Sequence, residues 1–249
     1  MKKLIVLIFV FVSALSFSQV PERPSPQKLY NNLSKEFPEF LSQSEANTIE
    51  TELETFSNET SNQICVVVVD DFGGTDASDF ATKIGNEWGV GTKDKNNGIV
   101  ILIKPTTSDG GHQLFIAVGY GLEGAIPDLA TKRIREEQMN PYLKSGENYQ
   151  AISNAVQVLS QLAKGEIDVK NYAKENDSND WSKVIIIVIV VLFMLLRIFS
   201  GGGGRRTFSG GGFIGGFGGG GFGGGSSGGG GFGGFGGGSF GGGGSGGSW

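Results

Sequence analysis

Cysteine and histidine are almost absent from this chain of 249 residues, which has one of each. Cys65 has no partner in the chain, so an intrachain disulfide is excluded. Because Cys65 lies in an apolar run, we expect it to be a small core residue. His112 falls in a polar loop and is interpreted as a solvated loop residue.

An excess of positive charge is also lacking. All 25 acidic residues lie between positions 19 and 183, with 15 lysines and arginines, so this part carries 15 − 25 = −10 against −5 for the whole chain. Such a region repels nucleic acid and anionic lipid. Its charge suits cations or basic partners, and solubility alone explains it equally well.

The first 18 residues are predicted to be a secretory signal peptide. Met1–Lys3 is a charged start, Leu4–Val12 is an apolar core, and small residues precede a cleavage point after Ser18. A permanent anchor is the alternative, but the apolar run is short for one. The mature chain then begins with a proline-rich leader, residues 19–27.

A second apolar run predicts one transmembrane helix over residues 181–200, after a polar linker at 166–180. Arg197, Arg205 and Arg206 lie at or beyond its end, so that side is expected to be cytoplasmic. The signal peptide independently predicts an extracytoplasmic, periplasmic-side location for the preceding domain.

The last segment, 201–249, holds 31 of the 44 glycines and has no acidic residue. Such a low-complexity chain offers little apolar surface to offset its ordering entropy, so we expect it to be disordered. Its regularly spaced phenylalanines and Trp249 favour weak self-association or partner binding, and a passive tail is the alternative.

Residues 28–165 are predicted to form one α/β domain, an αβα sandwich with a small mixed sheet. Two apolar runs flank an amphipathic helix, so they are expected to pair in parallel. The loop after the second run is too short for a crossover helix, so the third run should return antiparallel. Strands are expected at 63–69, 98–103 and 113–118. The first helix should begin at a capping box formed by Ser42 and Glu45 and run to Ser57. Further helices are expected after Asp76, at 127–139, where Pro141 should end the helix, and at 149–163.

Gly119-x-Gly121-x-x-Gly124 has the spacing of a dinucleotide fingerprint. That site requires a parallel strand leading directly into a helix, whereas this strand is predicted to be antiparallel and is followed by Ala125-Ile126-Pro127. Nucleotide binding is therefore rejected.

The antiparallel strand instead brings this loop beside the glycine-containing loop 88–98. The glycines would let backbone carbonyls approach a shared centre. Oxygen ligands on flexible loops suit Ca²⁺, and Mg²⁺ less well. The candidate metal ligands are Asp94, Asn97, Glu123 and Asp128, with Asn96 in the same neighbourhood.

A second acidic cluster is expected at the opposite end of the sheet. It contains Asp70, Asp71, Asp76 and Asp79. Helix capping with a solvated turn is the favoured interpretation, and a second functional site is the alternative.

Four segments in combination resemble the TPM-domain family: QICVVVVDDFGG, FATKIGNEWGVGTKDKNNGIVILI, FIAVGYGLEGAIPD and MNPYLKSGENYQAI. Members combine a signal peptide, an αβα domain, one span and often a Gly/Ser/Phe-rich tail ending near tryptophan. The resemblance implies an extracytoplasmic, membrane-tethered domain. Thylakoid-lumen members in plants act in photosystem repair and have been assigned phosphatase activity, and some bacterial members bind calcium. Asp94, Glu123 and Asp128 stand in the matching loops.

Two functions follow as hypotheses. A calcium-binding interaction module that acts on membrane proteins or complexes, in their assembly, repair or turnover, needs no chemistry. A phosphatase would have to be metal-assisted, because Cys65 has no Cys-x5-Arg loop, His112 has no histidine partner and no Asp-x-Asp pair follows a strand. Lys93, Lys95 or Arg133 would then hold the phosphate. The interaction module is preferred, and catalytic residues are not assigned.

Overall fold

The computed structural model describes residues 20–106, 111–173 and 232–249. The last of these ranges belongs to the same compact unit as the domain. The predicted signal peptide and the predicted span lie outside the described residues. Among the helices that are described, none is both long enough and apolar enough to cross a bilayer.

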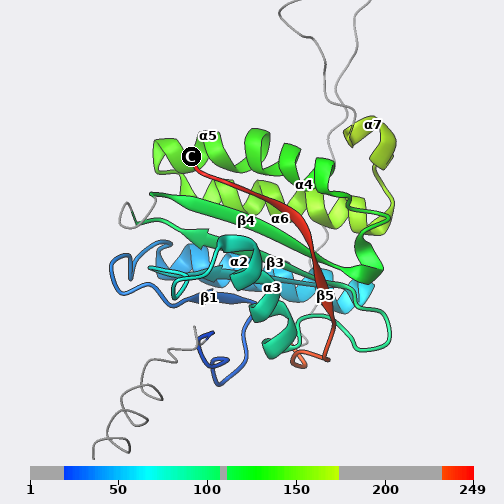
Figure 1. Cartoon of the computed structure of the whole chain (residues 1–249), viewed down its shortest axis with the longest axis horizontal. Coiled ribbons are helices and arrows are strands. Elements are labelled where there is room, and N and C mark those ends of the chain that lie inside the picture. The colour runs from blue at the N-terminus through cyan, green and yellow to red at the C-terminus, as the bar shows by residue number, and fades with distance from the viewer. Residues whose placement is uncertain (1–19, 107–110, 174–231) are drawn as a thin grey trace, which may run out of the picture. The chain divides into compact units, whose positions relative to one another are not determined.

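One mixed sheet of five strands forms the centre of the domain, in the order β1-β2-β3-β4-β5 (Figure 1). β1, β2 and β3 run parallel, β4 is antiparallel to β3, and β5 is antiparallel to β4. The strands are β1 (Tyr30–Asn32), β2 (Gln63–Val68), β3 (Gly98–Lys104), β4 (Gln113–Gly119) and β5 (Phe240–Gly247).

Helices cover both faces of the sheet, which confirms the predicted α/β architecture (Figure 1). α3 packs on one face, and α2 and α6 pack on the other. The helices are α2 (Gln43–Thr60), α3 (Ala77–Trp88), α4 (Asp128–Arg133), a π-helix (Ile134–Met139), α5 (Asn140–Ser145), α6 (Asn148–Lys164) and α7 (Val169–Ala173), with a 3₁₀ turn at Tyr120–Leu122.

Alternating side chains of the central strands supply the two cores. In β2, Val66 and Val68 face α2, whereas Cys65 and Val67 face α3, and every residue of β2 and β3 is buried. This is the burial expected of parallel strands covered on both faces. Cys65 is a core residue, as predicted.

The predicted directions of the three central strands are confirmed. Gln63 is paired with Gly98 in the parallel register, and Ile99 is paired with Val118 in the antiparallel one. The capping box at the start of α2 is present in full, with Ser42 and Glu45 each bonding the other's backbone N–H. The domain also extends further than predicted, because the leader packs: Trp88 Nε1 donates to the Pro21 carbonyl at 2.9 Å.

Two expectations were wrong. Pro141 does not end the helical region, which continues as α5 to Ser145. Pro141 lies in the first turn of α5, directly after the π-helix Ile134–Met139, and the first turn is where a helix tolerates proline. The tail is also not disordered throughout, because Phe240–Gly247 forms β5. A strand made almost entirely of glycine has few side chains to bury, but its backbone N–H and C=O groups form hydrogen bonds with the edge of β4.

Candidate functional site

Two glycine-containing loops meet at the end of the sheet where β3 begins and β4 ends. The N–H of Gly121 donates to the Asn96 carbonyl at 3.0 Å. A β carbon at Gly119 would overlap the carbonyl oxygen of Asn96, and one at Gly121 would overlap the carbonyl of Lys95. The glycine spacing therefore permits a close backbone contact between two loops, as the antiparallel direction of β4 requires.

Asn97, a predicted metal ligand, is buried and its carboxamide has protein partners at both ends. Its Oδ1 accepts from the N–H and the hydroxyl of Thr92 at 2.8 and 2.9 Å. Its Nδ2 donates to the Ser61 carbonyl at 2.7 Å and to Asn62 Oδ1 at 3.0 Å. Two accepted hydrogen bonds occupy the oxygen, so this side chain ties loops together.

Asp94, Glu123 and Asp128 are all exposed. Asp128 Oδ1 accepts from the N–H of Gly244 at 2.7 Å. A β carbon on Gly243 would lie 2.9 Å from Glu123 Oε1 and 3.7 Å from Asp128 Oδ1, so these two carboxylates converge on β5. Their fit to a hard cation is partial, since residues 20–106, 111–173 and 232–249 contain no group of three His, Cys, Asp or Glu side chains that could hold a metal. Metal binding by these residues stays a prediction.

The second acidic cluster stabilises local structure. Asp76 caps α3 by accepting from the N–H of Asp79 at 2.8 Å, and Asp71 accepts from the N–H of Gly73 at 2.6 Å. Asp70 accepts from the Ser34 hydroxyl and from the N–H of Lys35 at 2.7 Å. Burial would raise the pKa of Asp70, but these hydrogen bonds outweigh it and hold the pKa below the ordinary value.

A cavity of about 600 Å³ lies beside this cluster. Asp70, Asp71 and Asp76 line it together with Lys104, whose buried ammonium lies 5.7 Å from the centre of the Phe72 ring. Asp70 follows β2 and Lys104 ends β3, so the cavity is at the carboxyl ends of parallel strands, where α/β folds commonly bind ligands.

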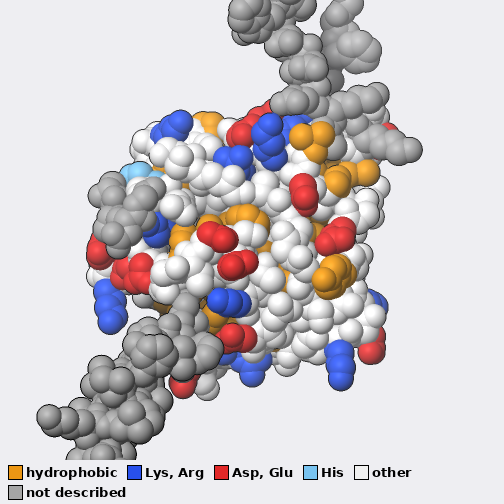
Figure 2. Space-filling model, in the orientation of Figure 1, with side chains coloured by type: hydrophobic (Ala, Val, Ile, Leu, Met, Phe, Trp, Pro, Cys, Tyr) orange, Lys and Arg blue, Asp and Glu red, His pale blue; other side chains and the backbone are white. Residues whose placement is uncertain are grey.

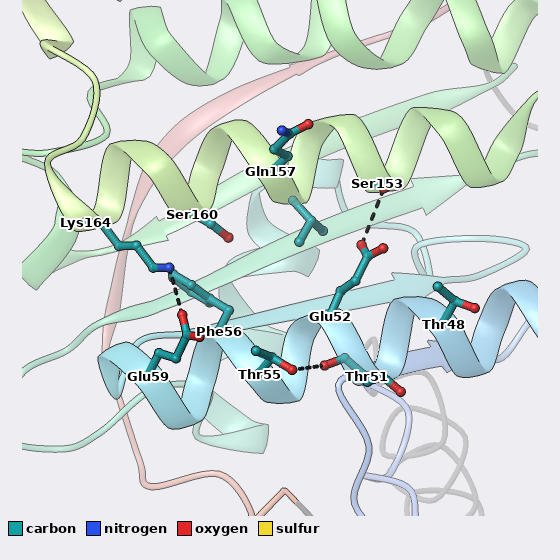
Figure 3. A pocket seen from close by; sticks show the side chains of 11 residues that line it. Thr48, Thr51, Glu52, Thr55, Phe56, Glu59, Ser153, Gln157, Ser160 and Lys164 are labelled. Atoms are coloured by element: carbon teal, nitrogen blue, oxygen red, sulfur yellow. Dashed lines mark hydrogen bonds and ion pairs between the residues drawn. The ribbon is translucent and has the colours of Figure 1, made fainter. Parts of the chain in front are cut away.

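A groove of about 660 Å³ between α2 and α6 is another hollow of the domain (Figure 3). The hydroxyls of Thr48, Thr51 and Thr55 on α2 bond carbonyls four residues earlier in their own helix. Lys164 Nζ contacts Glu59 Oε2 at 2.8 Å across the mouth. Most polar atoms of the groove thus have partners within the domain.

The edge of β4 is the surface that sequence reasoning missed, and β5 occupies it. Leu114 is paired with Gly247 at one end and Gly119 with Phe240 at the other. The side chain of Phe240 is 5% exposed and lies in the core beside α3. Figure 2 shows mostly white surface, the colour of backbone and uncharged polar groups, where β5 crosses this face in Figure 1, with acidic side chains nearby.

Residues before β5 are held by the two loops and by the leader. The N–H of Gly236 donates to the Gly91 carbonyl at 2.8 Å, and the N–H of Ser239 donates to Asn96 Oδ1 at 3.0 Å. The N–H of Phe235 donates to Gln27 Oε1 at 3.0 Å. The loops predicted to form a metal centre therefore bind the C-terminal segment.

One sequence signal pointed to this surface. Gly85 lies inside α3, where glycine is unfavourable unless something approaches closely. A β carbon there would lie 2.5 Å from the Phe240 ring. His112, interpreted as a solvated loop residue, is half-buried and its ring centre lies 5.0 Å from that of Trp249.

The fold and this edge define an αβα domain that binds an extended segment at an antiparallel edge strand. A family model for the TPM domain matches residues 35–162. This chain belongs to the TPM-domain family, as the sequence resemblance predicted.

Three solved structures are similar to parts of this chain. The N-terminal domain of a P. gingivalis protein has 25% identity and a TM-score of 0.48, covering 56% of this chain and 83% of that chain. BA42 from the psychrophilic bacterium Bizionia argentinensis has 18% identity and a TM-score of 0.44, covering 51% and 83%. The N-terminal domain of cg2496 from Corynebacterium glutamicum has 14% identity and a TM-score of 0.42, covering 62% and 93%. No curated protein matches the chain.

Proposed function

We propose that this TPM domain is an interaction module that binds extended protein segments by strand addition. The observation that carries the proposal is the edge of β4, which is occupied from Leu114 to Gly119 by a segment of almost pure glycine. In strand addition the main chain supplies the affinity and a few side-chain pockets supply the specificity. A segment with one buried aromatic side chain, Phe240, fits this mode.

The proposed setting is the extracytoplasmic side of a membrane, and the proposed clients are membrane proteins during assembly, repair or turnover. The predicted signal peptide and the apolar run support this setting. The net charge of −10 between residues 19 and 183 supports protein partners over nucleic acid or anionic lipid.

Strand addition is tested in the full chain. A chain that carries Phe240→Ala and Gly244→Val has a disabled segment, and a labelled peptide of residues 232–249 is added to it. We expect saturable binding, and much weaker binding to the unaltered chain, whose own segment competes. Absence of binding to a variant with a native circular dichroism spectrum would contradict the proposal.

Calcium binding is the second part of the proposed function. Glu123 and Asp128 converge on one place beside β5, and carboxylates on loops are ligands that Ca²⁺ accepts more readily than Mg²⁺ does. Asp94 would be recruited from the neighbouring loop. A cation bound only by the native state raises stability by RT ln(1 + [L]/Kd), about 2.7 kcal/mol at a hundredfold excess over Kd.

The calcium test follows the melting temperature of the full chain during titration. We expect a rise that disappears in Glu123→Ala and Asp128→Ala and persists in Asp79→Ala, a matched carboxylate in the other acidic cluster. No rise at millimolar Ca²⁺ would remove calcium from the proposal.

A second candidate function is hydrolysis of phosphate monoesters, favoured by the cavity beside Asp71 and Lys104. A metal ion there would supply an activated water. Activity should survive extensive purification and disappear in Asp71→Ala if this cavity is the site, or in Glu123→Ala if the glycine loops are. If the purified chain has no phosphatase activity, the interaction module remains as the proposed function.

A further inference from the structure

We propose that the β4 edge reads a defined sequence, a phenylalanine followed by glycines at fixed positions, and that residues 240–249 of this chain are its ligand. The inference rests on the proposed function, because it names the ligand of the same strand-addition site. Three features of the structure set the register: a notch for the aromatic ring, a clamp on its backbone, and positions that admit only glycine.

Two glycines of the domain create the notch. A β carbon at Gly85 would lie 2.5 Å from the Phe240 ring, and one at Gly98 would lie 2.9 Å from the same ring. Gly85 is inside α3, where glycine is less favourable than alanine. The space that its missing side chain leaves for Phe240 accounts for a residue that the helix itself disfavours.

The residue next to Gly85 clamps the same phenylalanine. Asn86 Oδ1 accepts from the N–H of Phe240 at 2.8 Å, and its Nδ2 donates to the Phe240 carbonyl at 3.4 Å. Both backbone groups of one residue are thus held by one carboxamide. A segment shifted by one residue would place a glycine in the notch and turn the phenylalanine to the other face of the sheet.

Several positions after Phe240 admit glycine alone or favour it. Gly242 has φ of 88° and Gly244 has φ of 137°, which L side chains rarely adopt. A β carbon at Gly244 would also overlap the Ile116 carbonyl oxygen. At Gly246 and Gly247 a β carbon would collide with the side chains of Phe115 and Arg135.

These contacts define the ligand class as an uncharged segment with phenylalanine and then glycine at the second, fourth, sixth and seventh following positions. The fifth following residue, Ser245, is small and its hydroxyl is buried. The segment between Phe232 and Trp249 has no charged side chain. Recognition is therefore by shape and backbone hydrogen bonds.

The C-terminal region itself shows that the pattern is selective. It has seven phenylalanines, at 208, 213, 217, 222, 232, 235 and 240. Only Phe217 and Phe240 are followed by glycine at all four positions. Phe217 has the large Phe222 at the fifth position, where Phe240 has Ser245, so one register matches completely.

The test compares peptides on the full chain that carries Phe240→Ala and Gly244→Val. Labelled peptides are residues 232–249, the same peptide with F240A, the same peptide with G244V, and residues 214–231, which contain Phe217. We expect each of the last three to bind at least about tenfold more weakly than the first. F240A loses the buried ring and G244V collides with the Ile116 carbonyl. Residues 214–231 place Phe222 at the position of Ser245, whose hydroxyl is buried.

A variant of the notch tests whether the space above Gly85 is what selects the phenylalanine ring. On a chain that also carries Gly85→Leu, the F240A peptide should bind as well as the unaltered 232–249 peptide does, since the leucine side chain occupies the notch and is favourable in a helix. If no peptide binds, strand addition itself is wrong. If all four bind the unmodified notch equally, strand addition stands and sequence reading at this edge is refuted. The peptide comparison decides the question even if the leucine variant does not fold.

Discussion

At the residue scale, the four predicted metal ligands have different surroundings. Asn97 is buried among protein partners, Glu123 and Asp128 approach β5, and Asp94 is exposed. All four were predicted as ligands on the same grounds, an oxygen-bearing side chain in or beside one of the two glycine-containing loops. Burial and hydrogen-bond partners now distinguish them.

Asn97→Ala tests the structural role of that residue. The substitution leaves the N–H of Thr92 and the Ser61 carbonyl without their partner, so we expect the free energy of unfolding to fall by roughly 2–4 kcal/mol. Denaturant unfolding of the full chain measures it. A change below about 0.5 kcal/mol together with loss of a calcium response would instead make Asn97 a ligand.

The lowered pKa of Asp70 makes the stability of the fold depend on pH. Its pKa is held below the ordinary value in the folded state, so its ionised form stabilises the fold above the unfolded-state pKa, about 3.9. This stabilisation is lost as the pH falls through the folded-state pKa. We expect Asp70→Asn to lower the melting temperature at pH 7, with the difference from the unaltered chain shrinking below about pH 4.

Ser34→Ala is the control for Asp70, because it removes one donor and keeps the carboxylate. The pKa of Asp70, followed by NMR titration, should rise. An unchanged pKa would mean that the backbone N–H groups of Lys35 and Glu36 are sufficient.

At the element scale, β4 would be an edge strand without β5. Exposed edges promote pairing with other chains, and covering the edge removes that hazard. β5 covers it with a segment that contributes one large side chain, Phe240.

Deletion of residues 240–249 tests the role of β5. We expect faster amide hydrogen exchange in residues 113–119, unchanged exchange in β2, and concentration-dependent association through the open edge. Hydrogen exchange with mass detection and light scattering measure these changes in the full-length background. Unchanged protection of β4 would mean that β5 does not cover it in solution.

At the scale of the whole molecule, the docked segment bears on the predicted topology. A single span at 181–200 would place the domain and the tail on opposite sides of the bilayer. The pairing of β5 with β4 requires the domain and the tail to lie on the same side of the bilayer. An extended glycine segment cannot reach back through a hydrocarbon core about 30 Å thick, because its backbone N–H and C=O groups would have no hydrogen-bond partners there. The predicted single span and the pairing of β5 with β4 therefore lead to different expectations for the side of the membrane on which the tail lies.

We expect the tail to share the compartment of the domain. Asn96→Cys with Ser239→Cys places two thiols where Asn96 Oδ1 and the N–H of Ser239 are 3.0 Å apart, and a short bismaleimide should join them in intact cells. Cys65 is fully buried and burial raises its thiol pKa, so it should not react. If the thiol introduced by Ser239→Cys were labelled only from the cytoplasmic side, the predicted single-span topology would hold and β5 would not pair with β4 in the same molecule.

Much of the fold was accessible from the sequence. Apolar runs and their connections predicted the parallel pair β2 and β3 and the antiparallel β4, and Ser42 with Glu45 predicted the start of α2. β1 was missed because three residues, Tyr30–Asn32, are too few for a periodic signal. The site was predicted in part, since the adjacency of the loops followed from strand direction but the occupant did not.

The sequence by itself determined the strand order of the central sheet, its burial on both faces and the family of the domain, because these depend on local periodicity and loop length. Tertiary structure decided the fate of the C-terminal segment. Its glycines carry no pattern that predicts a strand, and only the notch at Gly85 and Gly98, together with the free edge of β4, gives Phe240–Gly247 a place to pair.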